Sequence, residues 1–132
     1  MEAVNPTPGQ LQRVLAETPK DQPVVMLNLL SFRDQASYTD ETSDCTGREA
    51  YSLYMKEAAA CVRAVGAEVI WSGRCVGSLI APPEESWDQV LLVRYPSIDA
   101  FMAMLESPEY KGVAKHRTAA IKDSRLVANV ED

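Results

Sequence analysis

The 132-residue chain is poor in the residues that form metal sites and disulfide frameworks, because it has one histidine and three cysteines. Cys45, Cys61 and Cys75 share no C-x-x-C spacing, and their odd number fits reduced thiols in the cytoplasm. Without a second histidine or a cysteine cluster, a zinc site is not supported. We therefore expect no metal and no cofactor, although a single histidine would suffice to ligate a haem.

Other sequence signals are missing as well. The net charge is -6 and no run of lysine or arginine occurs, which argues against nucleic acid or a membrane as a partner. No segment approaches the roughly 20 apolar residues of a membrane-spanning helix, and the start lacks the pattern of a signal peptide. Phosphate-binding glycine loops and the G-x-S-x-G and H-E-x-x-H motifs are absent. We predict a cytoplasmic protein.

Four stretches have the pattern of β-strands. Residues 24–32 are apolar on both alternating faces, which is typical of a strand that is covered on both sides. Residues 67–77 and 125–130 alternate between apolar and polar, and residues 87–93 form an apolar, β-prone run. The alternation in residues 67–77 predicts that Val69 and Trp71 share a face. The glycine at position 73 indicates a bend in the second of these strands.

Capping signals predict the helices. Thr7 to Gln10 and Thr46 to Glu49 are capping boxes, and the second begins a long helix that Gly66 ends. Two further helices, after Ser97 and Ser107, follow each other without a long connection. The polar, acidic residues 33–45 precede the long helix, and both a mobile lid and a disordered loop fit them.

The order of the main elements is β-α-β-β-α-β with the second helical layer split. This order predicts an α+β fold of the ferredoxin-like type with an antiparallel sheet. Residues 1–22 would form a helical extension and residues 23–132 a single domain. Helices on one face of a four-stranded sheet leave the other face bare, yet these strands carry apolar residues on both faces. We therefore predict a homodimer joined through its sheet faces.

Five segments of the chain form a recognisable set: M-L-N-L-L-S-F-R at 26–33, W-S-G-R at 71–74, V-R-Y-P-S-I-D-A-F at 93–101, S-P-E-Y at 107–110 and H-R-T-A-A at 116–120. Together they resemble the dimeric α+β barrel superfamily, and within it the family called domain of unknown function thirteen-thirty. The likeness extends over roughly residues 23 to 130. The resemblance implies relatives that include cofactor-free quinol-type monooxygenases, lactone isomerases and haem-binding enzymes, and this range shows that the fold does not imply one function.

Two neighbouring residues in the last predicted helix are candidate catalytic residues. Arg117 lies inside the apolar stripe, together with Tyr110 and Ile121. It could hold a carboxylate or enolate oxygen through paired hydrogen bonds, or pack its stem and bridge to an Asp or Glu, and burial statistics favour the second role. His116, at the edge of the stripe, is the single histidine and could act as a general base or simply be solvated.

Polar and aromatic residues within the apolar strands and the long helix are candidate ligand-binding residues. Asn28 interrupts the most apolar strand, and Arg74 and Arg94 lie in strands that are otherwise rich in apolar residues. Such groups need partners when buried, so they indicate either a ligand pocket or an internal polar network. Tyr54 and Trp71 could form the walls around a flat apolar ligand, or belong to the core.

The function predicted from these residues is the binding of a small anionic or phenolic metabolite in a pocket between the sheet and the long helix. Asn28, Tyr54, Trp71 and Arg94 would line it, with His116 or Arg117. An enzymatic version would be a cofactor-free monooxygenase or isomerase, in which His116 moves a proton while Arg117 or Arg94 stabilises an oxyanion. The alternative is a non-catalytic ligand-binding or structural dimer.

Overall fold

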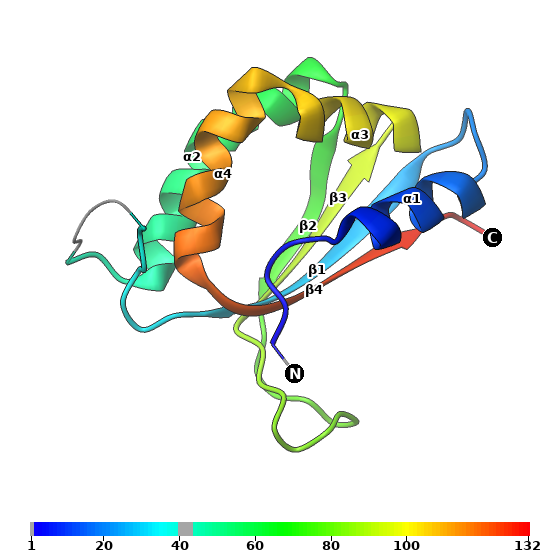
Figure 1. Cartoon of the computed structure of the whole chain (residues 1–132). Helices are drawn as coiled ribbons and strands as arrows, with labels where there is room; N and C mark the ends of the chain where they lie inside the picture. The colour runs from blue at the N-terminus through cyan, green and yellow to red at the C-terminus, as the bar shows by residue number, and fades with distance from the viewer. Residues whose placement is uncertain (1, 40–43) are drawn as a thin grey trace.

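The computed structural model describes residues 2–39 and 44–132, and in this part of the chain the strands form one antiparallel sheet (Figure 1). The strand order is β2-β3-β1-β4, so the most apolar strand occupies a central position. The strands are β1 (Val24–Phe32), β2 (Glu68–Arg74), β3 (Gln89–Tyr95) and β4 (Ile121–Asn129).

Three helices cover one face of this sheet (Figure 1). A fourth, near the N-terminus, lies across the open side between that face and the three helices (Figure 1). The predicted α+β, ferredoxin-like order is confirmed, with the second helical layer split and an extra N-terminal helix. Among the described residues no helix is both long and apolar enough to cross a membrane, and the cytoplasmic location stays a prediction. The helices are α1 (Pro8–Glu17), α2 (Gly47–Ala64), α3 (Ile98–Glu106) and α4 (Pro108–Ala120).

The predicted capping residues begin these helices. Thr7 and Thr46 each form a complete capping box, and the hydroxyl of Ser107 accepts a hydrogen bond from the Tyr110 amide. Gly66 follows α2 with a φ of 77°, a conformation that favours glycine. β4 begins at Ile121, directly after α4, and therefore earlier than the predicted strand.

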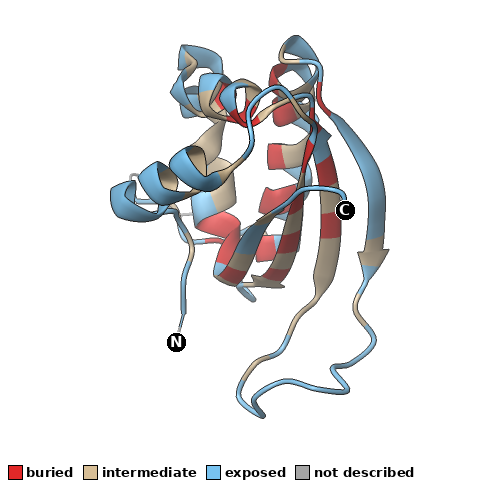
Figure 2. Cartoon of the chain, turned by 90° about the vertical axis from the view of Figure 1, so that its right-hand side faces the viewer, coloured by how far each residue is buried: buried red, intermediate tan, exposed pale blue. Residues whose placement is uncertain are grey.

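Two separate groups of buried side chains form the core, one towards each end of β1. The side chains of β1 that face the helices are Val24 and Met26 in the first group and Leu30 in the second, with Asn28 between them. Figure 2 shows buried and partly buried residues alternating along the central strands. A polar residue therefore occupies the part of β1 that lies between the two cores.

The other face of the sheet has no helix over it. There Leu27 of β1 pairs with Leu92 of β3 and Val127 of β4, and Trp71 of β2 lies opposite Leu92. We call this surface the bare face. The side chains of Trp71 and Val127 are 55% and 50% exposed. The prediction that Val69 and Trp71 share a face was wrong, because the pairing of β2 with β3 shifts between these two residues.

Three backbone segments meet where α2 begins. The Gly47 amide donates to the Arg33 carbonyl at 3.0 Å, and the Arg33 amide donates to the Ala120 carbonyl at 2.9 Å. A Cβ atom at Gly47 would collide with both carbonyl oxygens, and the Arg33 amide nitrogen would lie 2.8 Å away. Only glycine fits this junction, which joins the start of α2 and the end of α4 to the end of β1.

The variant Gly47→Ala is expected to lower the free energy of unfolding by about 2 kcal/mol or more, because backbone atoms cannot move aside as a flexible side chain would. The measurement is urea unfolding followed by circular dichroism. Gly112→Ala is the matched control, since nothing beyond its own helix backbone lies within 4 Å of its added Cβ. In a helix interior this change should stabilise by roughly 0.5–1 kcal/mol. Equal stability of the two variants would contradict the close approach.

Candidate functional site

A cavity of about 820 Å³ lies between the sheet and the helices. The helix residues that line it include Ala58, Ala59 and Ala114, whose small side chains leave the space between the two cores open. Met26 and Leu91 contribute apolar surface from the sheet. Ligand pockets in proteins usually have volumes of roughly 300–1,000 Å³ and are mainly apolar. The predicted pocket between the sheet and the long helix is therefore present.

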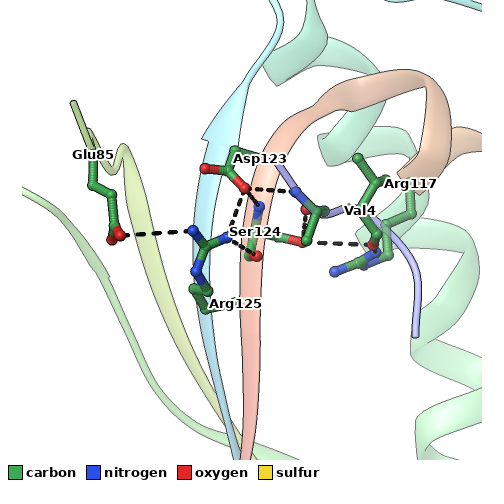
Figure 3. Close-up of polar contacts among 7 residues, drawn as sticks. Val4, Glu85, Arg117, Asp123, Ser124 and Arg125 are labelled. Carbon is green, nitrogen blue, oxygen red and sulfur yellow. Dashed lines mark hydrogen bonds and ion pairs between the residues drawn. The ribbon is translucent and has the colours of Figure 1, made fainter. Parts of the chain in front are cut away.

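Arg117 lines this cavity from α4. One of its guanidinium nitrogens, Nη1, donates to the Val4 carbonyl at 2.6 Å (Figure 3). No carboxylate in the described part of the chain forms an ion pair with Arg117. The bridge to Asp or Glu that burial statistics favoured is thus not seen among these residues. The guanidinium keeps a full positive charge and unused donors beside an apolar space.

Three tyrosines surround the same part of the cavity. The hydroxyl groups of Tyr54 and Tyr110 are 2.8 Å apart, and the rings of Tyr51 and Tyr54 pack with their centroids 5.3 Å apart. Burial raises the pKa of Tyr51 to about 12, although the charge of Arg117 opposes the shift. Burial also raises the pKa of Tyr54 well above its ordinary value, and Tyr110 raises it further. Tyr51 and Tyr54 are therefore neutral at physiological pH and do not offset the charge of Arg117 beside them.

Asn28 adds an amide to the cavity wall from the centre of β1. Its side chain is 8% exposed, and Nδ2 donates to the carbonyls of Met26 and Leu91 at 3.4 and 3.3 Å. The amide oxygen accepts no hydrogen bond from the described residues. Since every fully buried polar side-chain atom in the described chain has a partner, this oxygen is accessible from the cavity.

The N-terminal segment closes one side of the cavity. The Ala3 amide donates to Asp123 Oδ1 at 2.9 Å, and the Ser124 amide donates to the Ala3 carbonyl at 2.7 Å (Figure 3). Burial opposes the shift, but these bonds and Arg125 hold the pKa of Asp123 below its ordinary value. The segment brings the Val4 carbonyl to Arg117, and α1 then crosses the opening with Leu11 and Val14 among the lining residues.

His116 does not line the cavity. Its Nδ1 is 2.8 Å from the Tyr38 hydroxyl, and its Nε2 is 3.2 Å from Glu57 Oε2. Both ring nitrogens therefore have partners, and the imidazole connects α4 to α2 and to the segment before α2. Residues 40–43 of the segment predicted as a lid or a disordered loop lie outside the described residues. This arrangement holds His116 in place and gives it no contact with the cavity.

Three other predicted site residues also lie away from the cavity lining. Trp71 and Arg94 are on the bare face, since Trp71 pairs with Leu92 and Arg94 pairs with Val25. Arg74 is exposed at the end of the edge strand β2. The structure thus brings together Asn28, Tyr54 and Arg117, whereas the other four predicted residues are elsewhere.

Sequence reasoning missed two groups in the site. Tyr110 was placed on the apolar stripe of α4 without a role, although its position beside Arg117 on that stripe was a usable signal. The Val4 carbonyl gave no signal, because its contact with Arg117 spans 113 residues of chain and uses a backbone atom. Within the described residues no group of three His, Cys, Asp or Glu side chains could hold a metal ion.

The comparisons with known proteins agree with this fold. The model of the family described as "Domain of unknown function (DUF1330)" matches residues 36–130. The chain is similar to the RPA0582 protein of unknown function from Rhodopseudomonas palustris, with 36% identity, a TM-score of 0.89 and coverage of 100% of both chains. The family expected from the sequence motifs is thereby confirmed. No protein in the curated set matches the chain.

More distant structures share the fold alone. A dimeric protein of unknown function with a ferredoxin-like fold from Bacteroides fragilis has 14% identity and a TM-score of 0.53, over 83% of this chain and 96% of that one. SnoaB, a cofactor-independent oxygenase from Streptomyces nogalater, has 14% identity and a TM-score of 0.54, over 84% of this chain and 94% of that one. These likenesses place the chain among ferredoxin-like proteins of varied activity.

The buried tyrosines predict a loss of stability in alkali. A tyrosine whose pKa is raised by folding contributes stability that is complete below pH 10 and is lost as the pH rises towards its folded-state pKa, about 12 for Tyr51. The slope is roughly 1.4 kcal/mol per pH unit for each such tyrosine. Urea unfolding between pH 9 and pH 12 measures it, and Tyr51→Phe should show a shallower decline. A stability that is constant across this range would contradict the burial.

Proposed function

The chain belongs to the DUF1330 family, whose function is unknown, and we propose from its own cavity that it binds a small, largely apolar ligand with one anionic group. A carboxylate or an ionised phenol meets this description. Such a ligand would direct its anionic group to Arg117 and its apolar part along the surface formed by Met26 and Leu91. The Asn28 amide oxygen could accept a hydrogen bond from a hydroxyl on the ligand.

The observation that carries this proposal is the charge of Arg117 without a carboxylate partner in the described residues. A partly buried charge is costly unless it is paired, and the single hydrogen bond to Val4 leaves most of its donors unused. Tyr51 and Tyr54 are neutral and cannot compensate it. An anionic ligand would supply the missing charge, and two of its oxygens could take paired hydrogen bonds from the guanidinium.

The same groups would suit a cofactor-free conversion of the ligand, as SnoaB's described activity illustrates on the same fold. Arg117 would stabilise negative charge on an enolate or phenolate oxygen. The Tyr54 and Tyr110 hydroxyls, which form a hydrogen-bonded pair beside the cavity, would donate hydrogen bonds to that oxygen. His116 has no part in this scheme, since its ring nitrogens contact Tyr38 and Glu57.

Decanoate and decanol test the ligand class, because they share an apolar chain and differ in charge. We expect the protein to bind decanoate more tightly than decanol in isothermal titration calorimetry. Arg117→Met should weaken decanoate binding roughly ten- to a hundredfold, since a charge-assisted hydrogen bond contributes about 1.5–3 kcal/mol. Decanol binding should change little, because the apolar part of the cavity is preserved.

Lys115→Met is the matched control, since it removes the same charge from an exposed position on the same helix. This variant should bind both probes as the wild type does. The proposal fails if Arg117→Met retains full preference for decanoate, or if Lys115→Met loses that preference to the same extent. Thermal unfolding of each variant without ligand shows whether its fold is intact.

We also propose that the protein is a homodimer joined through its bare faces. Apolar residues from all four strands are partly or largely exposed there, including Leu27, Leu92, Trp71 and Val127. A contiguous apolar surface of this kind usually meets a partner, and a two-fold pair buries the same surface twice. The Bacteroides fragilis protein of the same fold is described as dimeric, which supports the proposal.

Val127→Asp is expected to convert the dimer to a monomer, because it places a charge beside Leu27 among the apolar side chains of the bare face. Sedimentation equilibrium at several protein concentrations measures the change. Leu53→Asp is the control, since Leu53 is an exposed apolar residue on α2, outside the bare face. A wild-type protein that is monomeric throughout, or a Val127→Asp dimer of unchanged affinity, would rule out this interface.

A further inference from the structure

The connection between β2 and β3, residues 75–88, is longer than a hairpin requires, and it projects beyond the end of the sheet (Figure 1). Hairpin loops usually have about two to five residues. We call residues 76–83 the arm. Its aliphatic side chains are as exposed as in an unfolded chain, at 95% for Val76, 102% for Leu79 and 98% for Ile80. In Figure 2 the arm is mainly exposed and lies below the sheet.

The root of the arm is fixed to the sheet. The Cys75 amide donates to the Asp88 carbonyl at 3.0 Å, and the Asp88 amide donates to the Leu30 carbonyl at 2.7 Å. The Phe32 amide donates to Asp88 Oδ2 at 2.8 Å. The first bond extends the pairing of β2 with β3, and the other two extend that of β3 with β1, so the arm leaves the sheet in a defined direction.

A second attachment shows which face of the sheet the root lies on. Glu85 Oε2 is 3.7 Å from Arg125 Nη2 (Figure 3), and the guanidinium of Arg125 lies 5.1 Å from the centroid of a Trp87 ring. Arg125 pairs with Leu29, whose position on β1 belongs to the bare face. The root of the arm is therefore continuous with the apolar surface proposed as the dimer interface.

The arm does not bury its aliphatic side chains against itself. It curves around a hollow of about 220 Å³, whose lining includes Val76, Ala81 and Trp87. Pro82 and Pro83 restrict the backbone, and the Glu85 amide donates to the Pro82 carbonyl at 3.0 Å. A short segment with a fixed root and a restricted turn thus presents Leu79 and Ile80 to its surroundings.

The charge of the connection argues against a lipid surface as its partner. Residues 75–88 contain Glu84, Glu85 and Asp88 and no lysine or arginine. Anionic membranes attract basic segments and repel acidic ones. A second copy of this chain fits better, because whatever covers the bare face also reaches the root of the arm at Trp87 and Arg125.

We propose that the arm packs against the second copy as an extension of the contact between the bare faces. This inference rests on the proposed homodimer. In a two-fold pair the arm of each protomer packs against the other protomer, so the aliphatic side chains of two arms are buried in each dimer. The arm thereby adds an apolar contact that lies beyond the end of each sheet.

The test is the dissociation constant of the full-length protein, measured by sedimentation equilibrium for the wild type and for the double variant Leu79→Ser, Ile80→Ser. Burial of two large aliphatic side chains predicts at least about a tenfold weaker dimer for the double variant. Leu53→Ser, an exposed aliphatic residue on α2, is the control and should leave the dissociation constant unchanged. The amides of residues 76–81 should also exchange hydrogen more slowly in concentrated than in dilute protein.

The outcomes separate the two proposals. If the wild type is a stable dimer and the double variant has the same dissociation constant, the proposed contact of the arm is wrong. The proposed contact between the bare faces is then unaffected. A wild-type protein that stays monomeric at every concentration overturns both. Sedimentation of the wild type with vesicles of phosphatidylcholine and phosphatidylserine, lost in the double variant, would assign the arm to a lipid surface and overturn its proposed partner.

Discussion

The close approach of Gly47 to the backbone of Arg33 and Ala120 is the constraint on which the rest of the structure depends. It joins α2, α4 and β1 at one end of the sheet, where the second core fills the space between the layers. The first core, with α3, fills the other end. Small residues such as Ala58 line the middle and do not fill it. Because the two packed ends hold the sheet and the helices apart, the layers cannot collapse on each other there. The cavity is therefore a consequence of how the two ends are packed.

The position of Arg117 explains why its charge has no carboxylate partner among the described residues. It lies on α4 shortly before the junction, so its backbone is held where α4 meets β4, while its side chain lines the cavity. The N-terminal segment, fixed to Asp123 and Ser124, brings a carbonyl and no carboxylate to the guanidinium. A charge held in this way is preorganised for an anionic ligand, because the side chain need not break an ion pair to bind it.

The elements could be predicted from the sequence because their signals are local. Thr46, Ser107 and Gly66 act within one helical turn, and the structure has all three as predicted. The faces of the strands were harder, since a single irregularity near Ile70 turns Trp71 to the opposite side of the sheet. Neighbouring strand residues such as Val93 and Arg94 face opposite sides, but alternation in the sequence does not say which of the two faces the helices cover. The contact of Arg117 with Val4 depends on chain segments that meet only in the folded protein.

Strand β1 connects the two proposed roles of the protein. Successive side chains of a strand point to opposite faces, so Asn28 lines the cavity while Leu27 and Leu29 belong to the bare face. A second copy packed on the bare face would contact the same strand whose other side chains line the cavity. Because β1 pairs on both sides, it cannot shift without breaking hydrogen bonds to β3 and β4. Assembly would therefore hold Asn28 in place without touching the ligand, which gives a physical reason for joining the dimer through the sheet.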